Sequence, residues 1–322
     1  MNILVTGCAG YIGSVLARTL INQGYTVYGL DALLYGDHGI SELLTNPRFT
    51  VYNADIRELA SYADILPRVD AIVHLAAIVG DPACARQPEL AEQVNWLATK
   101  QLFDAAKDAP NVKRFIFAST CSNYGKMTGN AYVDERSPLR PVSLYARLKV
   151  KAEEYILASL PRKGFSPTVL RFATAYGLSP RMRFDLTVNE FARDAALGKE
   201  LEVYGPHFWR PYCHVDDIAQ ACLLAIRAEQ SLIDHEVFNV GDTKDNYTKK
   251  DITEHLLAFE PRAKIRFIHK DEDPRDYRVN FSKIKNVLNY VSAKQFARGV
   301  REILDTVRNG SFPDPYAPHY HN

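Results

Sequence analysis

The stretch NILVTGCAGYIGSVLARTLINQG (2–24) is the part of the sequence that decides the fold. It starts with a short apolar run, typical of a buried parallel strand, and continues as G-x-x-G-x-x-G with apolar residues at helical spacing. Such glycines allow a tight turn and bring backbone N–H groups, at the positive end of a helix, close to a pyrophosphate. The stretch therefore predicts a strand, a phosphate-binding turn and a helix. The predicted dinucleotide contacts here are Gly7, Gly10, Tyr11, Ile12 and Gly13.

Apolar runs and helical patterns alternate beyond this stretch, which predicts β-α-β units and a parallel sheet. Right-handed crossovers make it an α/β protein with a Rossmann-type doubly wound parallel sheet. The pattern becomes irregular after about residue 170, which predicts a smaller mixed α/β substrate-binding lobe. We expect residues 1–170 to form a dinucleotide-binding domain, with 211–242 returning to it. Residues 171–210 and 243–322 would form the lobe.

Asp31 ends the second predicted strand, 18 residues after Gly13. An acid at this place can accept the ribose hydroxyls of adenosine and repels a 2′-phosphate. Because no Arg or Lys lies between Asp31 and Arg48, we expect NAD and not NADP. Asp55 follows the third predicted strand, where contact with the adenine edge and a plain turn role remain alternatives.

Tyr145 and Lys149 are four residues apart on one predicted helix, so both point to the same face. A lysine cation near the phenol would lower its pKa, and a phenolate could remove a proton from a sugar hydroxyl. Three hydroxyl groups at the end of the strand RFIFAS (114–119) could hold the substrate oxygen, those of Ser119, Thr120 and Ser122.

Composition restricts the classes of function. The 322 residues include 39 Lys+Arg and 38 Asp+Glu, a net charge of +1, which argues against nucleic acid as a partner. No apolar run is long enough for a membrane span, and the N-terminus lacks the pattern of a secretion signal, so we expect a cytoplasmic protein. The five cysteines form no C-x-x-C pair, so we expect no metal site. The ending HYHN (319–322) is predicted to be disordered.

Several motifs in order resemble the extended short-chain dehydrogenase/reductase superfamily, in particular its nucleotide-sugar-modifying enzymes. The resemblance covers nearly the whole chain. The motifs are TGCAGYIGS (6–14), Asp31, ADI (54–56), HLAA (74–77), Asn95, FASTCSNYG (117–125), Tyr145 with Lys149, LRFATAYG (170–177) and RPYCHVDD (210–217).

The resemblance implies roles for residues that periodicity alone does not single out. Tyr145 would be the catalytic acid or base, Lys149 would bind the nicotinamide ribose, and Thr120 would be the catalytic hydroxyl residue. Further cofactor contacts would be Asp55, Ile56, Leu75, Ala76, Ala77 and Asn95. Substrate contacts would be Thr120, Ser122, Thr174, Arg181, Arg183, Asn189, Arg210 and Arg275, the last two on the diphosphate. The resemblance also implies a homodimer through helices at about 90–109 and 143–160.

Departures from the family pattern narrow the activity. Sugar-nucleotide 4,6-dehydratases carry Asp-Glu directly after the catalytic Thr, and here Cys121 and Ser122 stand there. Thr174 replaces an asparagine that many relatives use against the nucleotide. Cys121 could instead shift a proton next to a ketone, or simply be packed. The stretch SPRMRFDLTVNEF (179–191) resembles enzymes of surface-polysaccharide pathways, some acting on GDP-linked heptoses.

The leading hypothesis is therefore an NAD-dependent nucleotide-sugar 4-epimerase that acts through a transient 4-keto sugar. The alternatives are a one-way nucleotide-sugar 4-dehydrogenase, possibly of GDP-heptose type, and a keto-sugar reductase. A fourth possibility is a dinucleotide sensor without catalysis. The reductase is disfavoured because Asp31 disfavours NADPH, and the sensor because Tyr145 and Lys149 are both present.

Overall fold

The computed structural model describes residues 1–127, 131–269 and 275–322. Its centre is a seven-stranded sheet in the order β11-β7-β5-β4-β1-β2-β3, and every neighbouring pair is parallel. The strands are β1 (Asn2–Thr6), β2 (Thr26–Asp31), β3 (Phe49–Asn53), β4 (Ala71–His74), β5 (Arg114–Thr120), β7 (Ser166–Phe172) and β11 (Glu236–Val240). The order runs outward in both directions from β1 and β4, so the predicted doubly wound sheet is confirmed.

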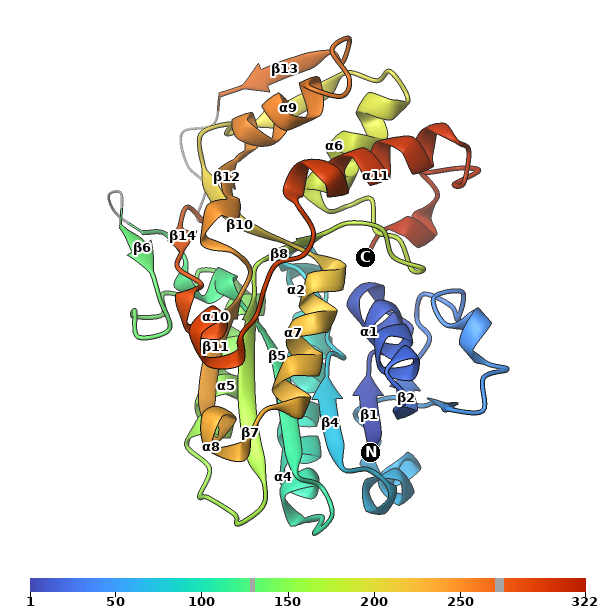
Figure 1. The fold of residues 1–322 in the computed structure, drawn as a ribbon, viewed down its shortest axis with the longest axis vertical. Coiled ribbons are helices and arrows are strands. Elements are labelled where there is room, and N and C mark those ends of the chain that lie inside the picture. Colours follow the sequence, from blue (N-terminus) through green and yellow to red (C-terminus); the bar gives the residue numbers. More distant parts are fainter. Residues whose placement is uncertain (128–130, 270–274) are drawn as a thin grey trace.

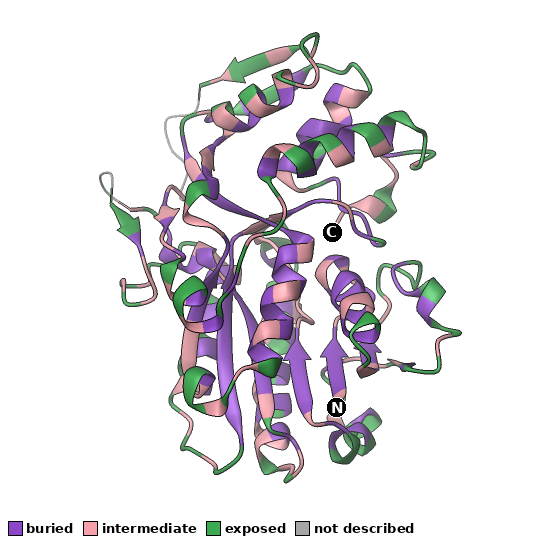
Figure 2. Cartoon of the chain, in the orientation of Figure 1, coloured by how far each residue is buried: buried purple, intermediate pink, exposed green. Residues whose placement is uncertain are grey.

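Helices cover both faces of this sheet (Figure 1). In β1, Ile3 and Val5 belong to one buried apolar cluster and Leu4 to another, because successive strand residues point to opposite faces. The continuous apolar run is thus a strand buried on both sides, and the central strands β1, β4, β5 and β7 are mostly purple in Figure 2. The flanking helices are α1 (Tyr11–Asn22), α2 (Asp81–Arg86), α3 (Pro88–Glu92), α4 (Thr99–Asp108), α5 (Leu144–Leu157), α7 (Val215–Arg227) and α8 (Gln230–Ile233).

The long helix expected at 90–109 is interrupted. A π-helical segment, Gln93–Ala98, joins α3 to α4, and such segments occur frequently at functional sites. The segment carries Asn95, whose side-chain amide donates to the carbonyl of Ile78 and whose oxygen accepts from the Ile78 N–H. These two bonds hold the chain just past β4.

A smaller part of the molecule lies beyond the carboxyl ends of the large sheet, at the top of Figure 1. It contains a three-stranded sheet, β12-β10-β8, and a two-stranded sheet, β13-β9. Its strands are β8 (Thr174–Tyr176), β9 (Leu201–Tyr204), β10 (Trp209–His214), β12 (Asn246–Thr248) and β13 (Ile265–Ile268). Its helices are α6 (Thr187–Ala196), α9 (Lys249–Leu257) and α11 (Phe296–Arg308). A short pair, β6 (Tyr132–Val133) with β14 (Arg278–Val279), and α10 (Ser282–Leu288) lie beside the large sheet.

The segment expected to return to the first domain, 211–242, divides between the two parts. Its first residues, 211–214, lie in β10 of the small sheet, whereas α7 packs on α1 and β11 pairs with β7 of the large sheet. The division of the chain into a cofactor domain and a substrate lobe remains a prediction about binding.

The expectation of a disordered ending is wrong. The Tyr320 ring packs against the rings of Phe184 and Phe312, with centroids 5.4 and 5.5 Å away. The backbone N–H of Phe184 also donates to the Tyr320 carbonyl at 2.9 Å. Composition suggested a free tail because its apolar partners are distant in the sequence.

Candidate active site

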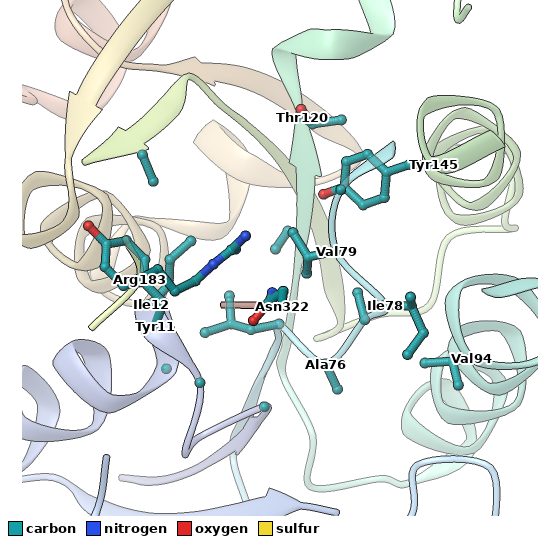
Figure 3. Close-up of a pocket in the computed structure, with 18 of the residues that line it drawn as sticks. Tyr11, Ile12, Ala76, Ile78, Val79, Val94, Thr120, Tyr145, Arg183 and Asn322 are labelled. Atoms are coloured by element: carbon teal, nitrogen blue, oxygen red, sulfur yellow. The ribbon is translucent and has the colours of Figure 1, made fainter. Parts of the chain in front are cut away.

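A cavity of about 390 Å³ opens at the carboxyl ends of β1 and β4, where the strand order reverses. This is the place where open α/β sheets bind ligands. Most of the predicted site residues line it, as Figure 3 shows for several. They are Gly7, Gly10, Tyr11, Ile12, Gly13, Asp31, Asp55, Ile56, Leu75, Ala76, Ala77, Thr120, Ser122, Tyr145, Lys149, Thr174, Arg181, Arg183 and Arg275.

Three predicted site residues do not line this cavity. Asn95 is fully buried behind it and holds the backbone at Ile78. Asn189 is also fully buried, accepting from the Gly177 N–H at 3.0 Å and donating to the Arg183 carbonyl at 2.8 Å. Arg210 is buried with its guanidinium 5.6 Å from the ring centroid of Tyr277, a cavity residue. These geometries fit positioning residues better than direct contacts.

The glycine turn has the close approaches that the motif requires. Gly7 has φ +72°, and a Cβ there would lie 2.9 Å from the backbone nitrogen of Ala76. A Cβ at Gly13 would overlap the carbonyl oxygen of Gly7. Gly10 precedes α1 without any side-chain cap, so the helix N-terminus faces the cavity with its backbone groups. Residues 7–13 thus form a cradle of main chain that fits the pyrophosphate of NAD.

Asp31 is placed by two backbone donors, because its carboxylate accepts from the N–H groups of Ala9 and Leu33, each at 2.9 Å. Burial raises the pKa of Asp31, while these N–H groups and the charge of Arg181 act in the opposite direction. Asp55 lies at the same end of the cavity, and a hydrogen bond from Arg57 lowers its pKa. The two acids are consistent with an adenosine subsite at this end.

Tyr145 and Lys149 lie near the start of α5, which Ser143 caps by accepting from the Ala146 N–H at 3.2 Å. Lys149 Nζ donates to the carbonyl of Ala118 at 2.7 Å and lies 6.0 Å from the Tyr145 ring centroid. Figure 3 shows the Tyr145 hydroxyl directed into the cavity, near Thr120. The helix therefore aims both predicted groups at one place.

The expected lowering of the phenol pKa is wrong for this arrangement. Burial raises the pKa of Tyr145 well above its ordinary value. The positive charge of Arg183 acts to lower this pKa but does not offset the effect of burial. Burial also lowers the pKa of Lys149 to about 8, because a desolvated ammonium is disfavoured. Tyr145 is therefore a neutral phenol near pH 7 in the chain alone.

Cys121 does not line the cavity. It is buried, its thiol lies 3.3 Å from the carbonyl oxygen of Arg171 as a donor, and burial raises its thiol pKa. This arrangement supports the packed alternative over proton transfer. The neighbouring Thr120 faces the cavity, and its Oγ1 accepts from the Ser122 N–H at 3.1 Å.

The sequence analysis missed a buried ion pair near Tyr145 and Lys149. Glu153 on α5 pairs with Arg171 on β7 at 2.7 Å, both almost without solvent exposure. Glu153 also accepts from Asn123 at 2.7 Å and from Ser119. The available signal was the spacing of Glu153, four residues after Lys149 on the same helix. The network ties α5 to the ends of β5 and β7, and so fixes Tyr145 against Thr120.

The cavity's other side is built from arginines. Arg183 forms an ion pair with Asp185, and Arg275 pairs with Asp81 at 3.1 Å. Arg183 projects into the cavity in Figure 3. Asn322 also lines the cavity, and sequence reasoning missed it, as it did Asp81.

The last residues of the sequence join the loop at 179–186 to α2. Burial opposes ionisation of Asp185, but hydrogen bonds from Arg183 and from the backbone N–H of Asn322 help to lower its pKa. Arg86 on α2 donates to the Asn322 carbonyl at 3.3 Å, and Arg181 donates to the His321 carbonyl at 3.0 Å.

A glycine cradle, an acid at the ribose end and a Tyr/Lys pair beside a threonine together define a dinucleotide-dependent oxidoreductase-type site. Residues 3–241 match the model of the NAD dependent epimerase/dehydratase family. The chain belongs to this family and is an enzyme of the NAD-dependent epimerase/oxidoreductase type.

Curated relatives span nearly the whole chain. UDP-glucuronate 4-epimerase 6 of Arabidopsis thaliana is 28% identical, over 94% of this chain and 71% of its own length. A dTDP-glucose 4,6-dehydratase of Actinoplanes sp. is 31% identical, over 94% of this chain and 97% of its own.

Solved structures agree with this fold. A UDP-glucuronic acid 4-epimerase from Bacillus cereus, in complex with UDP-glucuronic acid and NAD, has a TM-score of 0.85 at 28% identity, covering 96% of this chain and 99% of that one. A UDP-glucose 4-epimerase from Thermotoga maritima with UDP-glucose also has a TM-score of 0.85 at 28% identity, covering 97% of this chain and all of that one. NAD is therefore the cofactor, and the cradle and Asp31 fit it.

Among residues 1–127, 131–269 and 275–322, no helix is long and apolar enough to cross a membrane. Within the same ranges, no group of three or more His, Cys, Asp or Glu side chains could hold a metal ion.

Proposed function

We propose that this enzyme is an NAD-dependent nucleotide-sugar 4-epimerase that acts through a transient 4-keto sugar. The observation that carries the proposal is the convergence of Tyr145, Lys149 and Thr120 at one end of a cavity whose other end is the glycine cradle. The 4-epimerases among its relatives add support, because they span nearly the whole chain.

Tyr145 would accept the proton of the C4 hydroxyl as the C4 hydrogen leaves with its electron pair. When bound, NAD supplies the hydride acceptor and a positive charge, which lowers the pKa of a nearby phenol. Lys149 would hold the nicotinamide ribose, and Thr120 would hold the substrate oxygen. The keto sugar would then rotate in the site. Tyr145 would return its proton to the C4 oxygen as the hydride returns to the other face of C4, so no outside reductant is needed.

The dehydratase relative raises a second candidate, since 4,6-elimination needs an acid at the sugar's C6 hydroxyl. Among the residues that the structure describes, the carboxylates that line the cavity are those of Asp31, Asp55 and Asp81. The two positions after Thr120 hold Cys121 and Ser122, and neither can act as that acid. This favours epimerisation over dehydration.

The first experiment gives the purified protein about one equivalent of NAD and a panel of UDP-, GDP-, CDP- and dTDP-sugars. NADH absorbance and sugar stereochemistry by NMR are followed in the same tube. We expect a C4 epimer after many turnovers without lasting NADH. One equivalent of NADH with a stalled keto sugar would establish the 4-dehydrogenase instead, and loss of the C6 hydroxyl would establish the dehydratase.

A Tyr145→Phe variant separates catalysis from sensing. Loss of the proton carrier should lower kcat roughly 10²- to 10⁴-fold. Tyr155→Phe is the matched control, since Tyr155 lies on the same helix and donates to Asp104 outside the cavity. Equal turnover by both variants would contradict the assignment of Tyr145.

A homodimer is part of the same proposal. Leu97, in the segment joining α3 and α4, and Leu160, just after α5, are exposed apolar residues on the expected interface helices. Light scattering should give twice the chain mass, and a monomer would contradict the proposal. A cytoplasmic location and a role in polysaccharide biosynthesis belong to this proposal too.

A further inference from the structure

Arg181 stands apart from the other arginines at the cavity. It lines the cavity yet is only 2% exposed, and its Nε and Nη1 atoms are buried without a hydrogen-bond partner. The one N–H group with a partner donates to the His321 carbonyl. An unpaired buried guanidinium is costly, so these donors point to a ligand with acceptor oxygens.

The neighbours of Arg181 show which part of the cavity its guanidinium faces. Its guanidinium lies 4.4 Å from the ring centroid of Tyr35, in the loop after β2, and its charge acts on Asp31. A Cβ built at Gly39 would lie 2.9 Å from the Arg181 Cβ, and the same Cβ would meet the Ala9 carbonyl. Arg181 therefore sits at the corner between the glycine cradle and the ribose acid.

Arg183, two residues further on, has a different environment. Its guanidinium is satisfied by Asp185, and its charge acts on Tyr145 at the reaction end. Arg181 and Arg183, although only two residues apart in this loop, therefore approach different parts of the cavity. The resemblance had placed both arginines on the sugar nucleotide.

We propose that Arg181 binds the pyrophosphate of NAD, so that the loop at 179–186 adds a side-chain contact to the main-chain contacts of the glycine cradle. The planar fork of a guanidinium suits phosphate oxygens, and the two unpaired N–H groups supply the donors. The inference concerns the cofactor, so it holds whether the hydride is returned or kept.

The test measures ligand binding to NAD-free protein by calorimetry, with NAD, ADP and adenosine as probes. For Arg181→Gln we expect NAD and ADP to bind about 10- to 100-fold more weakly, and adenosine to change less than about twofold. The matched control Arg183→Gln should leave the three dissociation constants within about twofold and raise the KM for the sugar nucleotide.

Other outcomes overturn the proposal. Unchanged ADP binding with a raised sugar-nucleotide KM would return Arg181 to the substrate. Equal weakening of adenosine and ADP would mean that Arg181 acts on the adenosine pocket. If Arg181→Gln does not fold, Arg181→Lys keeps the charge and the stem, and should weaken ADP binding by a smaller factor while sparing adenosine.

Discussion

The cavity has two facing walls that are built from different groups. The glycine wall, residues 7–13 with Asp31, presents main chain and one carboxylate held by backbone N–H groups. The arginine wall, residues 179–186 with 318–322, presents long charged side chains held by distant partners. The glycine wall can change only by moving backbone, whereas the arginine wall can exchange its internal partners for a ligand. The first suits the pyrophosphate of NAD, to which Arg181 of the second wall would add a contact, and the rest of the second wall suits a choice among sugars.

The largest effect is expected from a single methyl group on the glycine wall. In Gly13→Ala the new Cβ would overlap the Gly7 carbonyl, so backbone must move. We expect a loss of more than about 3 kcal/mol, divided between stability and NAD binding. Thermal unfolding and NAD titration measure it. Gly24→Ala is the comparison, because Gly24 has positive φ and no atom near its Cβ, whereas Gly13 lies in α1 without a positive φ. Comparable losses in both variants would mean that the close approach at Gly13 costs no more than a positive φ does.

The next-largest expected effect is on the free energy of unfolding, and it appears on comparing two arginine–carboxylate ion pairs. Glu153→Gln leaves the buried Arg171 guanidinium without its charge partner and should cost about 3–5 kcal/mol of unfolding free energy. Asp185→Asn affects the pair with Arg183 at the cavity, where solvent screens more, and should cost about 1 kcal/mol or less. Denaturant unfolding of both variants measures the difference. Similar losses would mean that the arginine wall is as rigid as the core.

A smaller effect is expected from removing residues 319–322. Arg181 would lose its bond to the His321 carbonyl, and Asp185 would lose the Asn322 N–H. One lost hydrogen bond of this kind corresponds to about a fivefold change. We therefore expect the sugar-nucleotide KM to rise about fivefold through Asp185 and Arg183, and the dissociation constant of NAD to rise about fivefold through Arg181, with kcat within about twofold. His319→Ala, which removes ring contacts with His38 and Tyr320 but leaves both of these hydrogen bonds in place, is the control. An unchanged KM in the shortened protein would show that residues 319–322 do not contribute to the arginine wall.

The smallest effect near neutral pH comes from Lys149, between the two walls. Its pKa is lowered to about 8 by burial, so the ammonium loses its proton as pH rises through that value. The ratio kcat/KM should then fall, approaching about tenfold per pH unit. Stability should move the other way, because above about pH 8 the unfolded chain binds the proton that the folded chain has released. NMR titration of labelled lysine gives the pKa directly, and a value near the ordinary lysine pKa would contradict both trends.

The sequence predicts most of the glycine wall and of the catalytic helix, because both depend on neighbours in the chain. The run before Gly7 forms β1 with the expected bounds, and Ser143 caps α5 as its residue type suggests. Helical spacing also places Tyr145 and Lys149 on one face. By contrast, spacing says nothing of the solvent around Tyr145, and its pKa is raised where the sequence predicted a lowering.

By itself, then, the sequence determined the doubly wound sheet, the NAD-type cradle and the Tyr/Lys pair, since each follows from local periodicity and turn chemistry. Only the tertiary structure decided that Arg181 lies near enough to Asp31 for its charge to act there, that Asn322 contacts Asp185, and that Glu153 pairs with Arg171. Those contacts join residues far apart in the chain. Their pairing depends on how the loop at 179–186 and the final residues pack over the sheet, and no periodicity encodes that packing.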